Sequence, residues 1–477
     1  MNEHKPSFFL VIDQGGRSSR AMAYGSCGSC IAKHAASVAT KHPQEGWVEQ
    51  SPESVCESVC KALDGLFAEL GPDNCELMAA GLATQRSSIV CWDAQTGKAL
   101  SPVISWQDRR AATWLDGYAA HAESIHQVTG LLLSPHYGAS KFRWCLDHLS
   151  GVRDAWVNGR LSWGPLASFL AFQLLEERPH LIDPANASRT MLWNMESRNW
   201  DPGLLKLFGL PSEPFPRCMP TLGVFGHLRH GNRRIPMRIV TGDQSAALFS
   251  QGLPRSGTAY ITVGTGAFIQ RPMSSRSLFP DFLTSTVMIG DGRELYALEG
   301  TVNGAASAIA WFEQQCPQTD VVHSLDAWLA RDTVPPLFLN GIGGLGAPFW
   351  CPDFHSRFVG DGEPWQKAVA VAESIVFLLQ ANLDGMAAHL PPPDRIQIGG
   401  GLACLDGLCQ RLADLSGLPV HRSDETEATA RGTAQLLAGC PEAWVGLGQD
   451  KNFCPQHHPD LNRRYECMRK EMLKAVA

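Results

Sequence analysis

Two segments of the chain share one pattern of apolar and polar positions: an apolar run, a glycine-rich turn and a returning apolar run. The pattern occurs at residues 8–24 and again at residues 259–270. Short apolar runs bounded by glycine predict β-hairpins. Because each hairpin opens one half of the chain, the repeat predicts two related α/β domains with a cleft between them. We place these domains at residues 1–249 and 250–477.

Helical spacing is clearest in two segments of different character. After Ser51 and Pro52, which suit the cap and first turn of a helix, apolar residues recur every three or four positions up to Leu70. Residues 365–390 are apolar almost all round, so we expect a long helix buried between layers. Further strands are predicted at residues 31–39, 78–83, 89–92, 238–240 and 395–398, and further helices from residue 405 and over residues 427–437.

The middle of the chain carries weaker signals. Residues 114–175 are predicted to be mainly helical. Residues 201–236 are rich in proline, glycine and arginine, which favours short elements and loops. Residues 251–257 contain two glycines and a proline, and we expect them to link the two domains.

Composition and charge narrow the class of protein. The 477 residues exceed what one ordinary core contains, and 44% hydrophobic with 18% charged residues indicates a compact globule. A net charge of −7 gives no electrostatic reason to expect nucleic acid or an anionic membrane as a partner. No run approaches the ~20 apolar residues that cross a bilayer, and the N-terminal apolar run is too short for a signal peptide. We therefore expect a cytoplasmic protein.

The fifteen cysteines do not indicate disulfides or a metal. They are scattered, odd in number and mostly within apolar segments, which is typical of buried free thiols in a reducing compartment. Cys27 and Cys30 match the C-x-x-C pattern at an expected hairpin tip. No second pair at zinc spacing and no following redox helix accompany them, so we expect neither zinc nor redox chemistry there.

Candidate chemistry lies where the predicted strands end. Asp13 ends the first strand at the mouth of a loop in which Gly15 and Gly16 leave the backbone open to phosphate oxygens. Taken alone, this motif is equally typical of a β-hairpin turn. Asp243 ends a second strand, where a carboxylate can act as a base, and Gly264-Thr265-Gly266 offers a second phosphate loop. Together these features indicate phosphoryl transfer to a small hydroxylated molecule.

A longer series of motifs appears in order along the chain. The motifs are Asp13-Gln14-Gly15, Gln85-Arg86, Trp106-Gln107-Asp108-Arg109-Arg110, Asn186-Ala187-Ser188-Arg189-Thr190-Met191-Leu192, Gly242-Asp243-Gln244, Gly264-Thr265-Gly266, Leu298-Glu299-Gly300 and Gly344-Leu345-Gly346-Ala347-Pro348-Phe349-Trp350. This series closely resembles the FGGY carbohydrate kinases, and within them the glycerol kinase branch. The resemblance implies an α/β fold of two actin/hexokinase-like (ribonuclease H-like) domains with an interdomain active-site cleft. It also implies ATP and Mg²⁺ as cofactors and a sugar or polyol as substrate.

The resemblance assigns roles to individual residues. Asp243 takes the position of the family's general base. Asp13 takes the position of the aspartate that helps to place Mg²⁺, and we expect Asp243 to be a second metal ligand. The positions that line the polyol site are matched by Arg86, Ser87, Trp106, His136, Gln244 and Phe268. The positions of the nucleotide site are matched by Gly15, Gly16, Arg17, Ser18, Gly264, Thr265, Gly266, Ala306, Gly400, Gly401 and Leu405.

Two departures from the family pattern fall in the polyol site. Glycerol kinases carry a glutamate that accepts a substrate hydroxyl where this chain has Ser87, and a tyrosine where it has His136. Losing the carboxylate removes a strong acceptor and creates room. We therefore expect a sugar or polyol other than glycerol, with glycerol kinase as the alternative. If His136 does not bind substrate, we expect it to be a buried histidine that is hydrogen-bonded to the backbone.

The nucleotide site departs from the pattern as well. Gly16-Arg17 replaces Thr-Thr, and Arg17 either clamps phosphate or faces water. Leu405 and Ala306 replace an asparagine and a glycine of glycerol kinases. These changes motivate a second hypothesis, a kinase-derived binding or regulatory protein without catalysis, against which the presence of both Asp13 and Asp243 argues. The oligomeric state is open, with a homodimer among the options.

Overall fold

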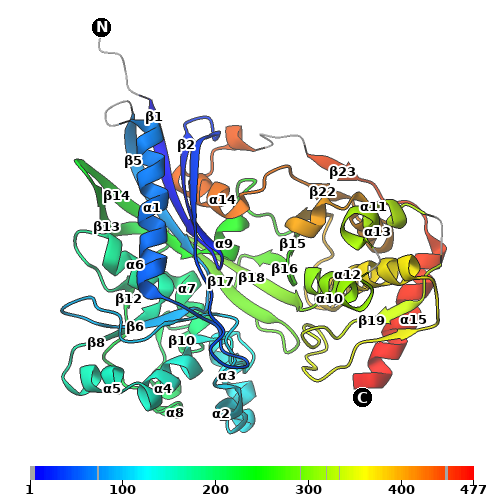
Figure 1. The fold of residues 1–477 in the computed structure, drawn as a ribbon, viewed down its shortest axis with the longest axis horizontal. Coiled ribbons are helices and arrows are strands. Elements are labelled where there is room, and N and C mark those ends of the chain that lie inside the picture. The colour runs from blue at the N-terminus through cyan, green and yellow to red at the C-terminus, as the bar shows by residue number, and fades with distance from the viewer. Residues whose placement is uncertain are drawn as a thin grey trace.

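The first lobe of the molecule is built on a six-stranded sheet (Figure 1). The structure is a computed structural model, and it describes residues 6–71, 75–290, 292–317, 320–331, 334–445 and 450–476. In sheet order the strands are β13 (Leu222–His230), β14 (Arg233–Gly242), β5 (Glu76–Thr84), β1 (Ser7–Gln14), β2 (Ser18–Gly25) and β3 (Cys30–Ser37). Strands β1 and β2 form the first predicted hairpin, and β1 runs parallel to β5.

The second lobe repeats this arrangement on a seven-stranded sheet. In sheet order its strands are β17 (Leu283–Gly290), β18 (Arg293–Val302), β16 (Ala267–Met273), β15 (Thr258–Val263), β21 (Arg395–Gly399), β22 (Val420–Arg422) and β23 (Lys451–Phe453). The β15–β16 hairpin is antiparallel, and β15 runs parallel to β21 as β1 does to β5. The internal repeat predicted from the two hairpin patterns is therefore confirmed.

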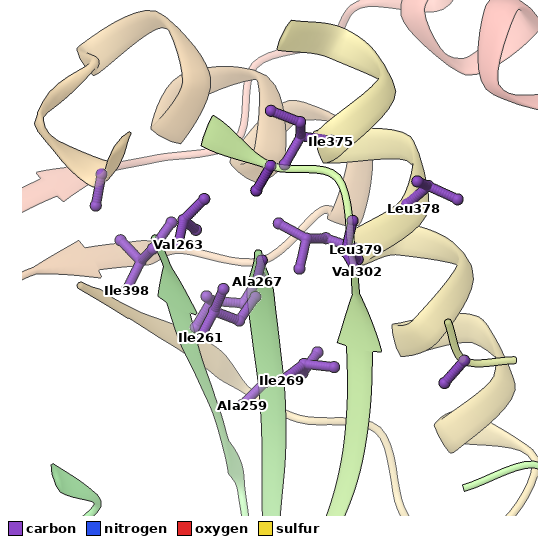
Figure 2. Packing of buried hydrophobic residues seen from close by; sticks show 14 of the residues in the cluster. Ala259, Ile261, Val263, Ala267, Ile269, Val302, Ile375, Leu378, Leu379 and Ile398 are labelled. Carbon is purple, nitrogen blue, oxygen red and sulfur yellow. The ribbon is translucent and has the colours of Figure 1, made fainter. Parts of the chain in front are cut away.

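Both predicted long helices are present. The Ser51 hydroxyl accepts a hydrogen bond from the Ser54 amide at 3.2 Å and caps α1 (Pro52–Leu70) as predicted. Helix α12 (Pro364–Ala387) covers the second sheet, where its Ile375 and Leu379 pack with the inward-facing residues of β15 and β16 (Figure 2). Among the described helices α12 alone is long and apolar enough to span a membrane, but 83% of its most apolar window is buried, so it is a core helix.

The remaining elements complete the two lobes. A four-stranded sheet of β4 (Glu49–Gln50), β7 (Val103–Ile104), β6 (Ile89–Asp93) and β8 (Leu161–Pro165) extends the first lobe. Short strand pairs join β9 (Leu181–Ile182) to β12 (Arg217–Cys218), β10 (Trp193–Asn194) to β11 (Asn199–Trp200), and β19 (Leu337–Leu339) to β20 (Arg357–Val359). The other helices are α2 (Ala112–Asp116), α3 (Ala122–Thr129), α4 (Gly138–His148), α5 (Ser150–Val157), α6 (Leu166–Leu174), α7 (Pro184–Ala187), α8 (Pro202–Leu207), α9 (Asp243–Ala247), α10 (Ala306–Gln315), α11 (Val321–Leu329), α13 (Asp406–Ser416), α14 (Ala428–Leu437) and α15 (Pro459–Val476).

The prediction of short elements and loops over residues 201–236 is confirmed for the part that holds α8 and β12 and is wrong from Leu222 onward. Strands β13 and β14 pair there as a long antiparallel ladder. Pro236 lies within β14, but β14 pairs with β5 only from Met237 onward. No second neighbour therefore needs the N–H that proline lacks. Strand β8 likewise interrupts the segment predicted as mainly helical, because it pairs with β6.

Helix α14 lies on the first lobe although it follows nearly all of the second lobe in sequence (Figure 1). Its Ala430 and Ala434 pack with Val11 and Met22 of the first sheet. The indole of Trp444, just beyond the helix, donates a hydrogen bond to the Ser26 carbonyl at 2.8 Å. A segment near the C-terminus thus completes the hydrophobic core of the first lobe.

Candidate active site

Asp243 stands where β14 ends and α9 begins. Its carboxylate accepts a hydrogen bond of 2.7 Å from the Gln244 amide. Burial raises the pKa of Asp243, and the positive charge of Arg86 partly offsets this rise. A Cβ on Gly242 would lie 2.5 Å from Cγ of Arg86, so glycine is what allows the arginine side chain to pass beside the carboxylate.

Asp13 lies at the same edge of the first sheet, because β1 and β14 both run parallel to β5. Burial raises the pKa of Asp13 to about 7, although the Arg20 guanidinium 3.1 Å away lowers it; the negative charge of Asp243 contributes to the rise. Arg20 also contacts Glu427, beside α14, at 2.9 Å. Two desolvated carboxylates that repel each other form a site that a divalent cation would neutralise.

The donor set at this edge fits Mg²⁺. The described residues contain no group of three or more acidic, histidine or cysteine side chains that could hold a metal. Mg²⁺ characteristically takes one or two carboxylates and completes its coordination with phosphate and water. Asp13 and Asp243 supply that number of carboxylates.

Arg86 is held by a buried cluster of charges between the lobes. Its Nη1 donates to Oε1 of Glu299 at 3.1 Å, and Nη1 of Arg189 donates to Oε2 of the same carboxylate at 3.1 Å. Gln270 adds a third donor at 2.8 Å. Although burial raises it, the two arginines bring the pKa of Glu299 down to about 2. The carboxylate is therefore ionised throughout the neutral range.

Ser87 has a strained backbone that a buried lysine supports. Its φ angle is 64°, a left-handed conformation that costs a non-glycine residue about 1–2 kcal/mol. The Lys141 ammonium donates to the carbonyl oxygens of Ser87 at 2.9 Å and His136 at 2.6 Å. One buried side chain thus fastens two of the predicted polyol-site residues through their backbones.

His136 and Trp106 are in contact, as a shared polyol site requires. Nδ1 of His136 lies 2.9 Å from the Trp106 carbonyl, which can only accept, so this nitrogen carries the proton. Burial lowers the pKa of His136 to about 4, so the ring is neutral near pH 7, and its Nε2 is an acceptor without a partner among the described residues. The backbone bond expected of His136 is therefore present, and its role in binding substrate stays a prediction. Trp106 remains 36% exposed, which leaves its ring face open to a ligand.

Gln244 and Phe268 approach the site from opposite lobes. Oε1 of Gln244 is buried and has no hydrogen-bond partner among the described residues, which fits an acceptor awaiting a substrate hydroxyl. Phe268 lies two residues before Gln270 on β16, and alternate residues of a strand share a face. Phe268 therefore sits on the face of the second sheet that carries Glu299's partner Gln270.

A chain of buried amides connects the first glycine loop to the Trp106 wall. The Gln50 side chain donates to the Gly16 carbonyl at 2.7 Å and accepts from the Gln85 side chain at 3.0 Å. Gln85 in turn accepts from the Ser88 hydroxyl at 3.1 Å, and that hydroxyl accepts from the Trp106 amide at 3.0 Å. The two halves of the predicted site therefore share one hydrogen-bond network.

The first glycine loop is open, but less of it is free than its sequence indicates. The Gly15 amide closes the hairpin on the Ser18 carbonyl at 3.0 Å. In the described chain the amides of Gly16 and Arg17 donate to no protein group, and Arg17 is exposed. A Cβ on Gly16 would come no closer than 4.0 Å to any atom, so the fold itself does not require glycine there. The open space and the two amides without a protein partner fit a loop that binds phosphate.

The second glycine loop caps a helix. The Thr265 carbonyl accepts from the amides of Ala305 and Ser307, each at 3.1 Å, and the Gly264 carbonyl accepts from Ala306 at 3.0 Å. The first turn of α10 is therefore satisfied by this loop, and Ala306 is committed to it. The exposed Thr265 and the partly exposed Gly266 remain available on the outer side of the turn.

The predicted adenosine turn contains glycines of two kinds. Gly400 has a φ of 93°, and a Cβ there would lie 2.6 Å from the Val263 carbonyl oxygen, so the fold requires glycine. A Cβ on Gly401 would meet nothing within 4 Å, which leaves space for a ligand. Leu405 is the N-cap residue of α13 and is half-buried, while the adjacent Asp406 pairs with Arg422 at 2.9 Å. Asp406 is thus engaged within the protein.

Comparison with known sequences decides the family. The models of the N-terminal and C-terminal domains of the FGGY family of carbohydrate kinases match residues 8–250 and 259–439. The chain belongs to the FGGY family. It is 35% identical over 445 residues to a glycerol kinase from Alkalilimnicola ehrlichii, covering 90% of this chain and 89% of that protein. It is 31% identical to glycerol kinase 1 of Pseudomonas aeruginosa, covering 96% and 94%.

Solved structures support the fold of this FGGY kinase. Plasmodium falciparum glycerol kinase with ADP matches with a TM-score of 0.91 at 20% identity, covering 100% of this chain and 99% of that one. A ligand-bound xylulose kinase from Lactobacillus acidophilus matches at 0.85 and 19% identity, covering 98% and 97%. The predicted actin/hexokinase-like pair of domains is confirmed, and so is a carbohydrate kinase, for which ATP is the phosphoryl donor.

One prediction is overturned by these relatives. The substitutions at Ser87 and His136 led us to expect a substrate other than glycerol, whereas the curated relatives at 31–35% identity are named glycerol kinases. The structure adds only that the His136 ring is bonded through Nδ1 to the Trp106 carbonyl and that burial lowers its pKa to about 4. The domain boundary at residue 250, the individual site roles, the cytoplasmic location and the homodimer remain predictions.

Sequence reasoning missed three side chains that organise the site. Glu299 and Lys141 lie in motifs of the family, but nothing in the sequence shows that they are buried or what they contact. Gln50 gave no signal, since a single polar residue before a helix cap is ordinary. Their roles follow from the partners that the fold brings to them.

Proposed function

We propose that the protein is an ATP-dependent glycerol kinase that transfers the γ-phosphoryl group to a primary hydroxyl of glycerol. The observation that carries the catalytic assignment is the Asp243 carboxylate, which stands at the strand end with a raised pKa beside Arg86. The choice of glycerol rests on the names of the relatives described above.

Asp243 orients the attacking hydroxyl and takes its proton as the new bond forms. A carboxylate with a pKa above its usual range is a better base near neutral pH than an ordinary aspartate. Arg86 and Gln244 bind the other hydroxyls, and Nε2 of His136 accepts from one of them. Trp106 and Phe268 provide apolar walls for the carbon chain.

The two glycine loops and Asp13 orient the phosphates. The amides of Gly16 and Arg17 donate to phosphate oxygens, and the Arg17 guanidinium adds charge at the loop tip. Asp13 and Asp243 hold Mg²⁺, which when bound neutralises charge on the transferring group. Catalysis then rests mainly on positioning and charge, because phosphoryl transfer asks little covalent work of the protein.

The deciding experiment measures ADP release with Mg·ATP over glycerol, erythritol, xylulose and gluconate. We expect glycerol to be the best substrate, with the specificity constant at least about tenfold above the others. Preferred turnover of another member would refute the substrate. Absence of turnover on all of them, with nucleotide still bound, would refute catalysis.

Asp243→Asn tests the base. Loss of general-base catalysis lowers kcat by about 10²–10⁴-fold while calorimetry finds glycerol affinity nearly unchanged. Asp384→Asn is the control, since Asp384 on α12 is bonded to the Tyr465 hydroxyl at 2.5 Å inside the second lobe. A variant at Asp243 that keeps more than a few per cent of activity would show that another group is the base.

A further inference from the structure

Glu299 lies in the middle of β18 and joins the two lobes at the polyol site. Its side chain is only 2% exposed. Its two oxygens receive Arg86 and Arg189 from the first lobe, each at 3.1 Å. From the second lobe it receives Gln270 at 2.8 Å. No other carboxylate contacts both of these arginines in the described chain.

Both arginines depend on this carboxylate. Arg86 and Arg189 have side chains only 6% and 9% exposed, and guanidinium groups cannot shed their charge. Glu299 is the carboxylate to which both buried cations are bonded, so its removal leaves them with only the more distant charge of Asp243. Arg189 is further fixed by the Ser285 hydroxyl at 2.7 Å, so the second lobe holds it at two points.

The direction of these contacts matters for substrate binding. In the described chain Nη1 is the atom through which the Arg86 side chain is bonded within the protein. Its Nη2 and Nε have no such bond among the described residues and therefore remain for a ligand. A guanidinium held at one corner presents its other donors in a fixed fork, which suits two neighbouring hydroxyls.

We propose that Glu299 is a positioning residue for the polyol: from the second lobe it holds Arg86 in the orientation in which the first lobe binds substrate hydroxyls. This inference rests on the proposed kinase function and adds to it a residue that does not itself touch the substrate. It also means that the polyol site is complete only when the lobes stand together as they do here.

Glu373 provides a matched control within the same chain. It too is a buried carboxylate, 4% exposed, that accepts from two arginines, Arg411 at 3.1 Å and Arg464. These three residues lie on α12, α13 and α15, inside the second lobe. A merely structural role for Glu299 predicts that Glu299→Gln and Glu373→Gln behave alike.

The test compares KM for glycerol, KM for ATP and kcat in the full-length enzyme. We expect Glu299→Gln to raise KM for glycerol by about ten- to a hundredfold, because a bond to a charged group is lost, while KM for ATP and kcat change by less than about threefold. Glu299→Asp, which keeps the charge, should restore at least half of the loss on a logarithmic scale. Glu373→Gln should lower thermal stability but leave KM for glycerol unchanged.

Several results would overturn the proposal. These are an unchanged KM for glycerol in Glu299→Gln, an equal rise in both KM values, or the same kinetic change in Glu373→Gln. If Glu299→Gln does not fold, Gln270→Met carries the test, since it frees the carboxylate without removing a charge and should raise KM for glycerol by about three- to tenfold. The substrate panel on the wild type separates the glycerol kinase function from the positioning role of Glu299. If another polyol is preferred, the glycerol assignment fails, and the same comparison of Glu299 and Glu373 variants is made with that polyol.

Discussion

Replacing Lys141 by methionine tests whether a buried cation holds the substrate loops. The side chain is fully buried, and burial lowers the pKa of its ammonium from 10.5 to about 7. The difference between these values corresponds to about 5 kcal/mol, at ~1.4 kcal/mol for each tenfold change in proton affinity. Between pH 7 and 10.5 the unfolded chain therefore binds a proton at this position that the folded protein does not.

The sign of the pH dependence follows from this proton. Because the folded pKa is the lower one, the stability associated with Lys141 is complete above pH 10.5 and is lost as the pH falls towards 7. Methionine does not titrate. The free energy of unfolding of the wild type, minus that of Lys141→Met, should therefore rise by about 2–3 kcal/mol between pH 7.5 and 9.5.

Urea unfolding at pH 7.5, 8.5 and 9.5 measures this difference. Lys470→Met, which removes an exposed lysine of α15, is the matched control. Titrations of other groups are common to all three proteins and cancel. If the difference for Lys141→Met is independent of pH, the desolvation of the Lys141 ammonium is refuted.

Two further predictions concern the cation site and the core. Asp13 must be ionised to bind Mg²⁺, and its pKa is raised to about 7. The affinity for Mg·ADP, measured by calorimetry, should therefore fall more than about tenfold between pH 7 and 5.5. The Asp13→Asn variant measures the fall that comes from titration of the nucleotide itself, and an equal fall in that variant would contradict the assignment of Asp13. Leu379→Ala on α12 removes a fully buried side chain and should cost about 2–5 kcal/mol of unfolding free energy. Leu473→Ala, at a side chain 54% exposed, should cost less than about 0.5 kcal/mol.

The sequence predicted those parts of the fold in which local signals agree with the final environment. The two hairpins, the Ser51 cap and the apolar α12 each carry their own pattern, and each appears where expected. Most of β14 was missed, because Pro236 and its neighbours resemble a loop. Proline is tolerated there because only β13 pairs with that part of β14, and the sequence does not show this. Strand pairing is a non-local property, and a single sequence does not display it.

The candidate site divides in the same way. Asp13 and Asp243 were chosen because carboxylates at strand ends suit metal binding and base catalysis, whereas Arg86 was chosen only through the family resemblance. The left-handed backbone of Ser87 was not, since serine has no preference for it and the Lys141 bond that supports it spans 54 positions. The substrate expectation failed because it rested on two positions, whereas the relatives named glycerol kinases match over about nine tenths of the chain or more.

The packing of α14 on the first sheet has a consequence for the order of synthesis. Val11, Met22 and Tyr24 are covered by Ala430, Ala434 and Trp444, which leave the ribosome some 200 residues after the first hairpin-based domain ends. At about 5–20 residues per second the apolar face of the nascent first sheet stays bare for about 10–40 s. The N-terminal half should therefore need chaperones during translation and should express poorly by itself. A fragment that ends near residue 250 should become soluble only when a peptide covering residues 426–445 is supplied in trans.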